Sequence, residues 1–289
     1  MAYQVQVPLS GIAGWRYLER TQEAQKATFE NDALMQREIA YFKENIGKVE
    51  TAEDLIGDYR LLEFALTAYG LEDDTYKKAL VRTVLEGGTD DEDSLANRIT
   101  VNGYKEMAED FGFGNETGVQ TATEGFADKI ISAFKERKFE TAVSEEKDYL
   151  GTVMAFERSI DMLTGAEAAA EGDEEAKAKS WYTVLGDEDL RTFFEGAFGL
   201  PSQFVNLDID QQARMMERKA EQFLGDGSLS ALEDEANVDK LITRFLAFQQ
   251  IEEGWNNPQG PGANALKILQ GNHSSASYGI INLLYGIDE

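Results

Sequence analysis

The sequence contains no cysteine, which excludes disulfides, thiolate catalysis and zinc sites built on cysteine. Histidine is almost absent, since His273 is the single one. A serine triad, a multi-histidine metal site or a histidine acid–base pair would each need that residue. It lies in a loop of Gly, Asn and Ser residues, which favours a surface position over catalysis. We therefore expect no catalytic residue, no metal site and no cofactor.

Long apolar runs are missing as well. No segment approaches the roughly 20 apolar residues that a membrane-spanning helix needs, so we expect no membrane span. The N-terminus lacks a basic start followed by a long apolar core, and we expect no Sec-type signal peptide. Glycine-rich nucleotide-binding patterns do not occur. The acidic runs Asp90–Asp93 and Asp208-x-Asp210 lack the order of an EF-hand loop, which favours solvated helix starts.

Positive charge is scarce, with 27 Lys and Arg residues against 54 Asp and Glu residues and a net charge of −27. An acidic surface repels phosphate backbones and anionic lipid, so we expect neither nucleic acid nor bare membrane as a partner. Hydrophobic residues make up 42% of the 289 positions, enough for a sizeable core in one large or two ordinary domains.

One stretch occurs twice. Residues 55–71 (LIGDYRLLEFALTAYGL) return as residues 184–200 (VLGDEDLRTFFEGAFGL), 129 positions later and without a gap. In each copy an aspartate suits a helix N-cap, worth about 1 kcal/mol, and apolar residues follow at i, i+3, i+4 and i+7. A glycine then suits the left-handed position past the helix end, and the next leucine can fold back onto the last turn. The residues in these structural roles are Asp58, Gly70 and Leu71 in the first copy and Asp187, Gly199 and Leu200 in the second.

The remaining patterns predict an all-α fold of two similar multi-helix units with short connections and flanking terminal segments. A strand-like alternation occurs only at Gln4–Val7. Ala155–Ile160 echoes Tyr41–Ile46 at a spacing of 114 rather than 129, so the second copy carries 15 extra residues. The predicted organisation is an arm and helix start at 1–28, a first unit at 29–113, a linker and helix at 114–138, a second unit at 139–248 with an insertion at 165–180, and a tail at 249–289.

The tail differs in character from the two units. A connection with two prolines, Gly254–Gly262, precedes two short apolar patches separated by a polar loop. Such a segment either docks on its own domain or binds a partner protein. The candidate residues for this contact are Leu266, Leu269, Ile280, Ile281 and Leu284.

Several short runs together resemble one bacterial family. These runs are Pro8–Thr21 (PLSGIAGWRYLERT), Ile39–Phe42, Ala52–Leu55, Leu61–Leu71, Leu95–Arg98 and Phe111–Phe113. In this order they are similar to the domain-of-unknown-function family DUF1217, closely over 8–113 and more loosely over the second half. The resemblance implies a helical protein with no assigned enzymatic activity. Genes of the family tend to lie among flagellar genes, which implies a role associated with the flagellum.

We therefore expect a non-enzymatic structural or accessory protein of the bacterial flagellum, with flagellar proteins as partners. It would stay in the cytoplasm or leave by the flagellar type III route, where disulfides would obstruct passage of the unfolded chain. A cytoplasmic helical chaperone or adaptor for an exported subunit is the alternative, acting through residues 263–286. An enzyme on a helical scaffold is a third hypothesis, for which the sequence nominates no pocket. The oligomeric state does not follow from the sequence.

Overall fold

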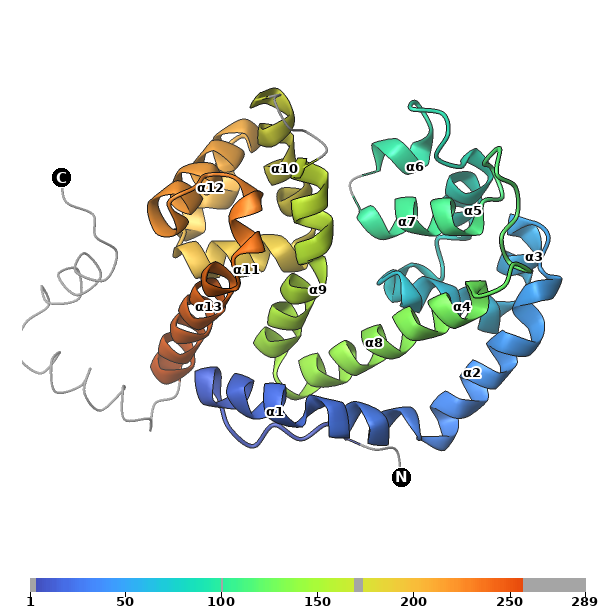
Figure 1. Ribbon diagram of the computed structural model, residues 1–289, viewed down its shortest axis with the longest axis horizontal. Helices are drawn as coiled ribbons and strands as arrows, with labels where there is room; N and C mark the ends of the chain where they lie inside the picture. Colours follow the sequence, from blue (N-terminus) through green and yellow to red (C-terminus); the bar gives the residue numbers. More distant parts are fainter. Residues whose placement is uncertain (1–3, 100, 169–173, 257–289) are drawn as a thin grey trace, which may run out of the picture. The chain divides into compact units, whose positions relative to one another are not determined.

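The protein is all-α over the part of the chain that the structure, a computed structural model, describes: residues 4–99, 101–168 and 174–256. Thirteen α-helices and four short 3-10 helices occur in these ranges and no strand does, which confirms the predicted all-α class (Figure 1). Among these helices, none is both long enough and apolar enough to cross a bilayer.

The α-helices are α1 (Gly11–Glu30), α2 (Ala33–Asn45), α3 (Ala52–Gly57), α4 (Tyr59–Ala68), α5 (Lys78–Gly87), α6 (Leu95–Arg98), α7 (Asn102–Phe111), α8 (Phe126–Glu146), α9 (Asp148–Ala168), α10 (Glu174–Gly186), α11 (Glu188–Phe198), α12 (Ile209–Leu224) and α13 (Glu235–Asn256). The 3-10 helices are η1 (Ile46–Lys48), η2 (Glu72–Asp74), η3 (Ser202–Asn206) and η4 (Leu229–Glu233).

The described chain divides into two compact units. Unit 1 comprises residues 4–7, 18–99 and 101–151, and unit 2 comprises residues 8–17, 152–168 and 174–256. Helices α1 and α9 therefore each contribute residues to both units. The predicted linker and helix at 114–138 lie inside unit 1. Part of the predicted insertion at 165–180, and the tail beyond residue 256, lie outside the described residues.

Unit 1 is built around α4. Its apolar face is buried, and Phe64 at the middle of that face is only 3% exposed. The Phe64 ring stacks against Phe42 of α2, with centroids 4.2 Å apart, and against Phe134 of α8, with centroids 3.7 Å apart. Stacked aromatic rings add about 0.5–1.5 kcal/mol per pair beyond the area they bury. This stack ties α2, α4 and α8 together.

Unit 2 is built around α11 in a comparable way. The Phe193 ring stacks against Phe156 of α9, with centroids 3.8 Å apart and planes 11° apart. It also contacts Phe245 of α13, with centroids 5.0 Å apart. Gly196 allows the close approach of α11 and α13, because a Cβ atom there would lie 2.6 Å from the Phe245 ring. Trp181 of α10 lies edge-on to Phe194, and its indole N–H donates to the carbonyl of Gly227.

The start of α4 is fixed by Asp58. One of its carboxylate oxygens accepts the backbone N–H groups of Arg60 and Leu61, at 3.0 and 3.1 Å. After the helix, Gly70 adopts a left-handed φ of 69°. The N–H of Leu71 then donates to the carbonyl of Leu66 at 2.8 Å, which satisfies a carbonyl that the helix leaves open.

Helix α11 begins and ends in the same manner. The Asp187 carboxylate accepts the N–H of Leu190 at 3.0 Å. Gly199 has a φ of 62°, and the N–H of Leu200 donates to the carbonyl of Glu195 at 2.9 Å. Each residue named as a cap in the sequence therefore has a defined hydrogen-bonding or backbone role in its unit.

Two helix limits differ from the sequence expectation. The pattern predicts a helix from Asp74, but α5 begins at Lys78, because Asp74 closes η2 and binds the hydroxyl of Tyr104 and the ammonium of Lys77. The residue pattern also predicts a mostly helical stretch from Thr121 to Leu163, but α8 begins at Phe126 and ends at Glu146, before Lys147, whose backbone is extended. Gly151 permits that tight turn, because a Cβ atom there would meet Ser144 at 2.6 Å.

Replacing Gly70 or Gly199 by valine is expected to lower the free energy of unfolding by more than about 1 kcal/mol each, because a β-branched side chain fits a left-handed backbone poorly. Urea denaturation of the wild type and both variants measures the loss. Gly57→Val is the matched control, since φ is not positive there and a Cβ atom would meet nothing within 4 Å. Equal stabilities for the wild type and both cap variants would contradict the assignment.

Candidate functional site

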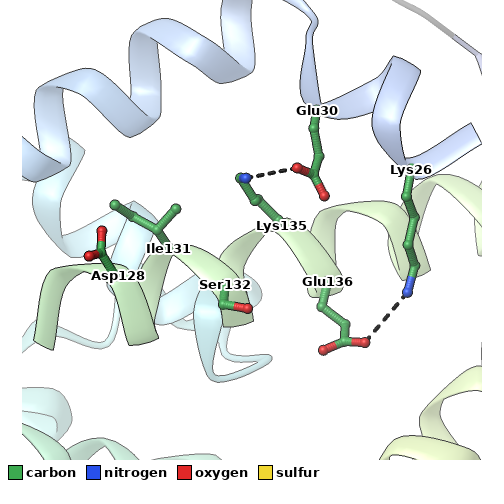
Figure 2. Close-up of a pocket in the computed structure, with 7 residues that line it drawn as sticks. All are labelled: Lys26, Glu30, Asp128, Ile131, Ser132, Lys135 and Glu136. Carbon is green, nitrogen blue, oxygen red and sulfur yellow. Dashed lines mark hydrogen bonds and ion pairs between the residues drawn. The ribbon is translucent and has the colours of Figure 1, made fainter. Parts of the chain in front are cut away.

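A groove lies between α1 and α8 within unit 1 (Figure 2). Its volume is about 380 Å³, and its lining residues are Lys26 and Glu30 from α1 and Asp128, Ile131, Ser132, Lys135 and Glu136 from α8. Residues three or four positions apart lie on the same side of a helix. The spacing 128, 131, 132, 135, 136 therefore brings one side of α8 to the groove, and the spacing 26, 30 does the same for α1.

Charged side chains pair across the groove. The ammonium of Lys135 lies 2.7 Å from a carboxylate oxygen of Glu30, and that of Lys26 lies 3.5 Å from Glu136 (Figure 2). Near one end, Lys43 of α2 pairs with Asp128 at 2.8 Å. Ion pairs between side chains this exposed contribute about 0–1 kcal/mol each to stability. Little free energy therefore holds each pair together.

An aromatic contact lies beside these ion pairs. Phe29 of α1 meets Phe139 of α8 edge to face, with ring centroids 5.8 Å apart. The ammonium of Lys26 lies 5.5 Å from the Phe139 ring centroid, within the range of a cation–π interaction. The apolar contact holds α1 on α8, and the charged side chains line the opening above it.

The groove is unusual in its charge. Two lysines and three acidic residues line it, and Lys43 at its edge makes the signs equal. The whole chain carries two acidic residues for every basic one. Such a surface matches a partner that presents both signs of charge at helical spacing, because each ion pair can exchange one of its members for a partner side chain.

A second set of polar contacts links helices through tyrosine. The pairs, each a tyrosine hydroxyl donating to an aspartate, are Tyr41 to Asp58 at 2.5 Å, Tyr69 to Asp110 at 2.8 Å, Tyr104 to Asp74 at 2.5 Å and Tyr182 to Asp210 at 2.6 Å. Burial raises the pKa of Tyr69 and Tyr104, and the aspartates raise it further. Burial alone would raise the pKa of Asp58 and Asp74, but the hydrogen bonds they accept lower it. The bonds to Asp58 and Asp74 are therefore charge-assisted hydrogen bonds at neutral pH.

Among the described residues, three buried side-chain polar atoms have no hydrogen-bond partner: Nε1 of Trp15, Nε of Arg82 and Oε1 of Glu195. Glu195, the acidic one of the three, lies on α11. Burial raises the pKa of its carboxyl group, and Arg191, 3.6 Å away, lowers it only in part. An ionised carboxylate in this position costs free energy that an apolar side chain would not.

The acidic residues considered for calcium have other roles. Asp208 accepts the N–H of Gln211 and caps α12, Asp210 binds Tyr182, and Asp90 accepts the N–H of Glu116. Across residues 4–99, 101–168 and 174–256, no three His, Asp or Glu side chains gather as a metal site would require. His273 and the tail residues Leu266, Leu269, Ile280, Ile281 and Leu284 lie outside the described residues.

The groove itself was not predicted from the sequence. The usable signal was the spacing of four between Asp128, Ser132 and Glu136, which puts polar side chains on one side of the helix. That spacing does not reveal which other helix packs against this side of α8. Pairing α8 with α1 requires contacts between residues 105 positions apart, as in Lys135 with Glu30.

Comparison with known proteins gives one family and one solved structure. The family described as "Protein of unknown function (DUF1217)" matches residues 68–238, a range that lies later in the chain than the sequence resemblance indicated. The X-ray crystal structure of protein AGR_C_984 from Agrobacterium tumefaciens matches with a TM-score of 0.69 and 24% identity. The match covers 86% of this chain and 99% of that one, and at this identity it shows a shared fold. No curated protein matches.

Replacing Glu195 by leucine is expected to raise the free energy of unfolding by about 1 kcal/mol at pH 7, because it removes a partly desolvated carboxylate. The raised pKa fixes the sign of the pH dependence. Protonation removes the charge of the wild-type residue, so the gain shrinks as the pH falls through the raised pKa. Thermal unfolding between pH 4 and pH 8 measures both effects. Glu221→Leu, at an exposed position of α12, is the control, and a gain of the same size there would contradict the argument.

Proposed function

Because the chain belongs to the DUF1217 family, we propose that it is a non-enzymatic structural or accessory protein of the bacterial flagellum. It acts through helical packing and contacts with other flagellar proteins, either in the cytoplasm or after export by the flagellar type III route. The flagellar assignment rests on the gene neighbourhood that the family resemblance implies. The contact role rests on the groove of unit 1.

The groove carries this proposal, because its properties suit a protein partner. It is lined by side chains of both signs in a chain whose net charge is −27. Its ion pairs are partly exposed, so a partner can replace one member of each pair without first opening the core. A helix that presents Lys and Glu side chains four residues apart has the spacing to do so.

We also propose that the two units descend from one duplicated helical module. Three correspondences support it. The stack of Phe42 on Phe64 has its counterpart in the stack of Phe156 on Phe193. The caps of α4 and α11 share two bonds at the same spacing of 129: Leu61 to Asp58 is matched by Leu190 to Asp187, and Leu71 to Leu66 by Leu200 to Glu195. Helices α3 and α10 both end in a glycine directly before the capping aspartate.

The proposed copies have diverged in their polar links. In unit 1 the carboxylate of Glu53 in α3 pairs with Arg82 of α5 at 2.5 Å. At the position 129 residues later, unit 2 has Tyr182, whose hydroxyl donates to Asp210 of α12. Likewise, the fully buried Leu66 of unit 1 corresponds to Glu195 of unit 2, 129 residues later. If the two copies keep the same packing, the aromatic stack is retained while the polar contacts change. The two units differ in this way.

The flagellar assignment predicts that the protein copurifies with flagellar structures. A tagged copy expressed from its own gene is expected in the purified basal-body and hook fraction, with little in washed cytosol. A strain that lacks the flagellar export ATPase is expected to retain an exported protein inside the cell. Recovery only as a soluble complex with one export client would favour the chaperone or adaptor instead. Absence from both preparations, with unchanged motility of a deletion strain, would contradict both.

Charge reversal in the groove tests the contact role. The variant Lys135→Glu breaks the pair with Glu30, and the double variant Lys135→Glu with Glu30→Lys restores a pair of inverted orientation. The double variant is expected to keep its stability within about 0.5 kcal/mol of the wild type, yet to lose recovery in the flagellar fraction. Lys105→Glu, at an exposed position of α7 outside the groove, is the matched control. Recovery of the double variant in the flagellar fraction at the level of the wild type would contradict the groove as a contact site.

A further inference from the structure

Three basic side chains gather around the ring of Phe223, near the end of α12 in unit 2. The guanidinium carbon of Arg244, on α13, lies 3.9 Å from the centroid of that ring. The ammonium of Lys219, one turn earlier on α12, lies 5.6 Å from the same centroid, and the ammonium of Lys240, on α13, donates to the Phe223 carbonyl. Phe198 of α11 lies parallel to the ring, with centroids 6.1 Å apart. We call Lys219, Lys240 and Arg244 the basic cluster.

Within the described ranges, no carboxylate forms an ion pair with the basic cluster. Three nearby aspartates have other partners: Asp226 accepts the N–H of Ser228, Asp234 that of Ala236, and Asp239 pairs with Arg16. Glu221 lies two positions from Lys219 and therefore on a different side of α12. Burial lowers the pKa of the Arg244 guanidinium, and among the described residues no acidic group opposes that shift.

The contacts inside the fold use only part of the hydrogen-bonding capacity of the basic cluster. Nε of Arg244 donates to the carbonyl of Ala197 at 2.9 Å, and Lys240 donates to that of Phe223, so each satisfies a carbonyl near a helix end. A guanidinium and an ammonium each carry further N–H donors. The terminal nitrogens of Arg244 are not among the buried unpaired atoms, so solvent reaches them. A planar guanidinium with accessible donors suits bidentate binding of a carboxylate.

The arrangement of the basic cluster also favours an anionic partner. Lys240 and Arg244 lie four residues apart on α13, and like charges at this spacing repel one another. The whole chain has two acidic residues for every basic one, yet these cations stand together without a counter-charge. Beside them lie two half-buried rings, Phe223 and Phe248, the second with its centroid 5.8 Å from the guanidinium of Arg244. The surface therefore combines positive charge with partly exposed aromatic carbon.

We propose that the basic cluster binds an acidic helical segment of another protein, with one carboxylate on Arg244 and a second, one helical turn away, on Lys240. An apolar side chain of the segment covers the exposed parts of Phe223 and Phe248. A peptide suits the site better than a nucleic acid, because a chain of net charge −27 repels a dense polyanion at long range. The inference is independent of the flagellar assignment and of the groove, which lies in unit 1.

Fluorescence anisotropy with the full-length protein and three labelled probes tests the class of ligand. The first probe is a helical peptide of Glu-Ala-Ala-Leu repeats, which presents carboxylates one turn apart beside an apolar stripe. The second has Gln in place of every Glu, and the third is a single-stranded DNA of similar length. We expect saturable binding of the Glu peptide at low ionic strength, weakened by salt, and little binding of the other two. No binding of the Glu peptide, equal binding of the Gln peptide, or tighter binding of the DNA would overturn the proposal.

Two variants locate the binding of the Glu peptide. Arg244→Gln is expected to weaken it at least about tenfold, because the charge-assisted hydrogen bonds of the guanidinium are lost. The double variant Lys219→Gln with Lys240→Gln keeps the guanidinium and is expected to weaken binding about threefold or more. Thermal unfolding shows whether each variant is folded. If Arg244→Gln is not, the double variant decides, and wild-type affinity of the double variant would then overturn the proposal.

Arg214→Gln is the matched control. It removes one positive charge from an exposed position of α12, nine residues before Phe223 and so on the opposite side of that helix. Its affinity for the Glu peptide is expected to equal that of the wild type, and a loss as large as that of Arg244→Gln would show that only net charge matters. Analytical ultracentrifugation of the same samples tests a different occupant. Self-association of the wild type that Arg244→Gln abolishes would assign the basic cluster to a second copy of the chain instead.

Discussion

The stack of phenylalanine rings on the central helix of each unit is the contact on which the remaining structure depends. In unit 1 Phe64 meets rings from α2 and α8, and in unit 2 Phe193 meets rings from α9 and α13. Flat rings stack well only at a narrow range of separations, so the helices that carry them have little freedom to slide. Caps at both ends of α4 and α11 give these helices a defined length, which places the stacking ring at its middle. The other helices then pack around an already fixed centre.

Much of this design was readable in the residues. The caps Asp58 and Asp187, the glycines Gly70 and Gly199 and the apolar face between them are local features, and local features follow from side-chain chemistry and spacing. Features that depend on distant partners were not readable. The late start of α5 follows from the bonds of Asp74 to Tyr104 and Lys77, and the break at Lys147 depends on the close approach of Gly151 to Ser144, which the sequence does not show. The groove of unit 1 belongs to the same class, because its two walls are far apart in the sequence.

The distribution of charge separates what stabilises the protein from what its surface can recognise. The buried aromatic and aliphatic side chains provide the stability, and exposed ion pairs add little to it. The ion pairs across the α1–α8 groove therefore matter more as a charge pattern on the surface than as contacts that stabilise the packing of the two helices. In a chain of net charge −27, a region with equal numbers of both signs stands out from its surroundings. Long-range repulsion is weaker there than the net charge of the whole chain would suggest, so another acidic protein can approach this part of unit 1.

The placement of the tryptophans has a practical consequence for how unfolding is observed. Trp15 and Trp181 both lie in unit 2, and Trp255 lies in the last turn of α13, in the same unit. Intrinsic tryptophan fluorescence therefore monitors one half of the molecule, whereas the far-ultraviolet dichroism of the helices averages over both. Coincident curves from the two probes would mean that the halves melt together, and separated curves would mean that each is its own cooperative unit.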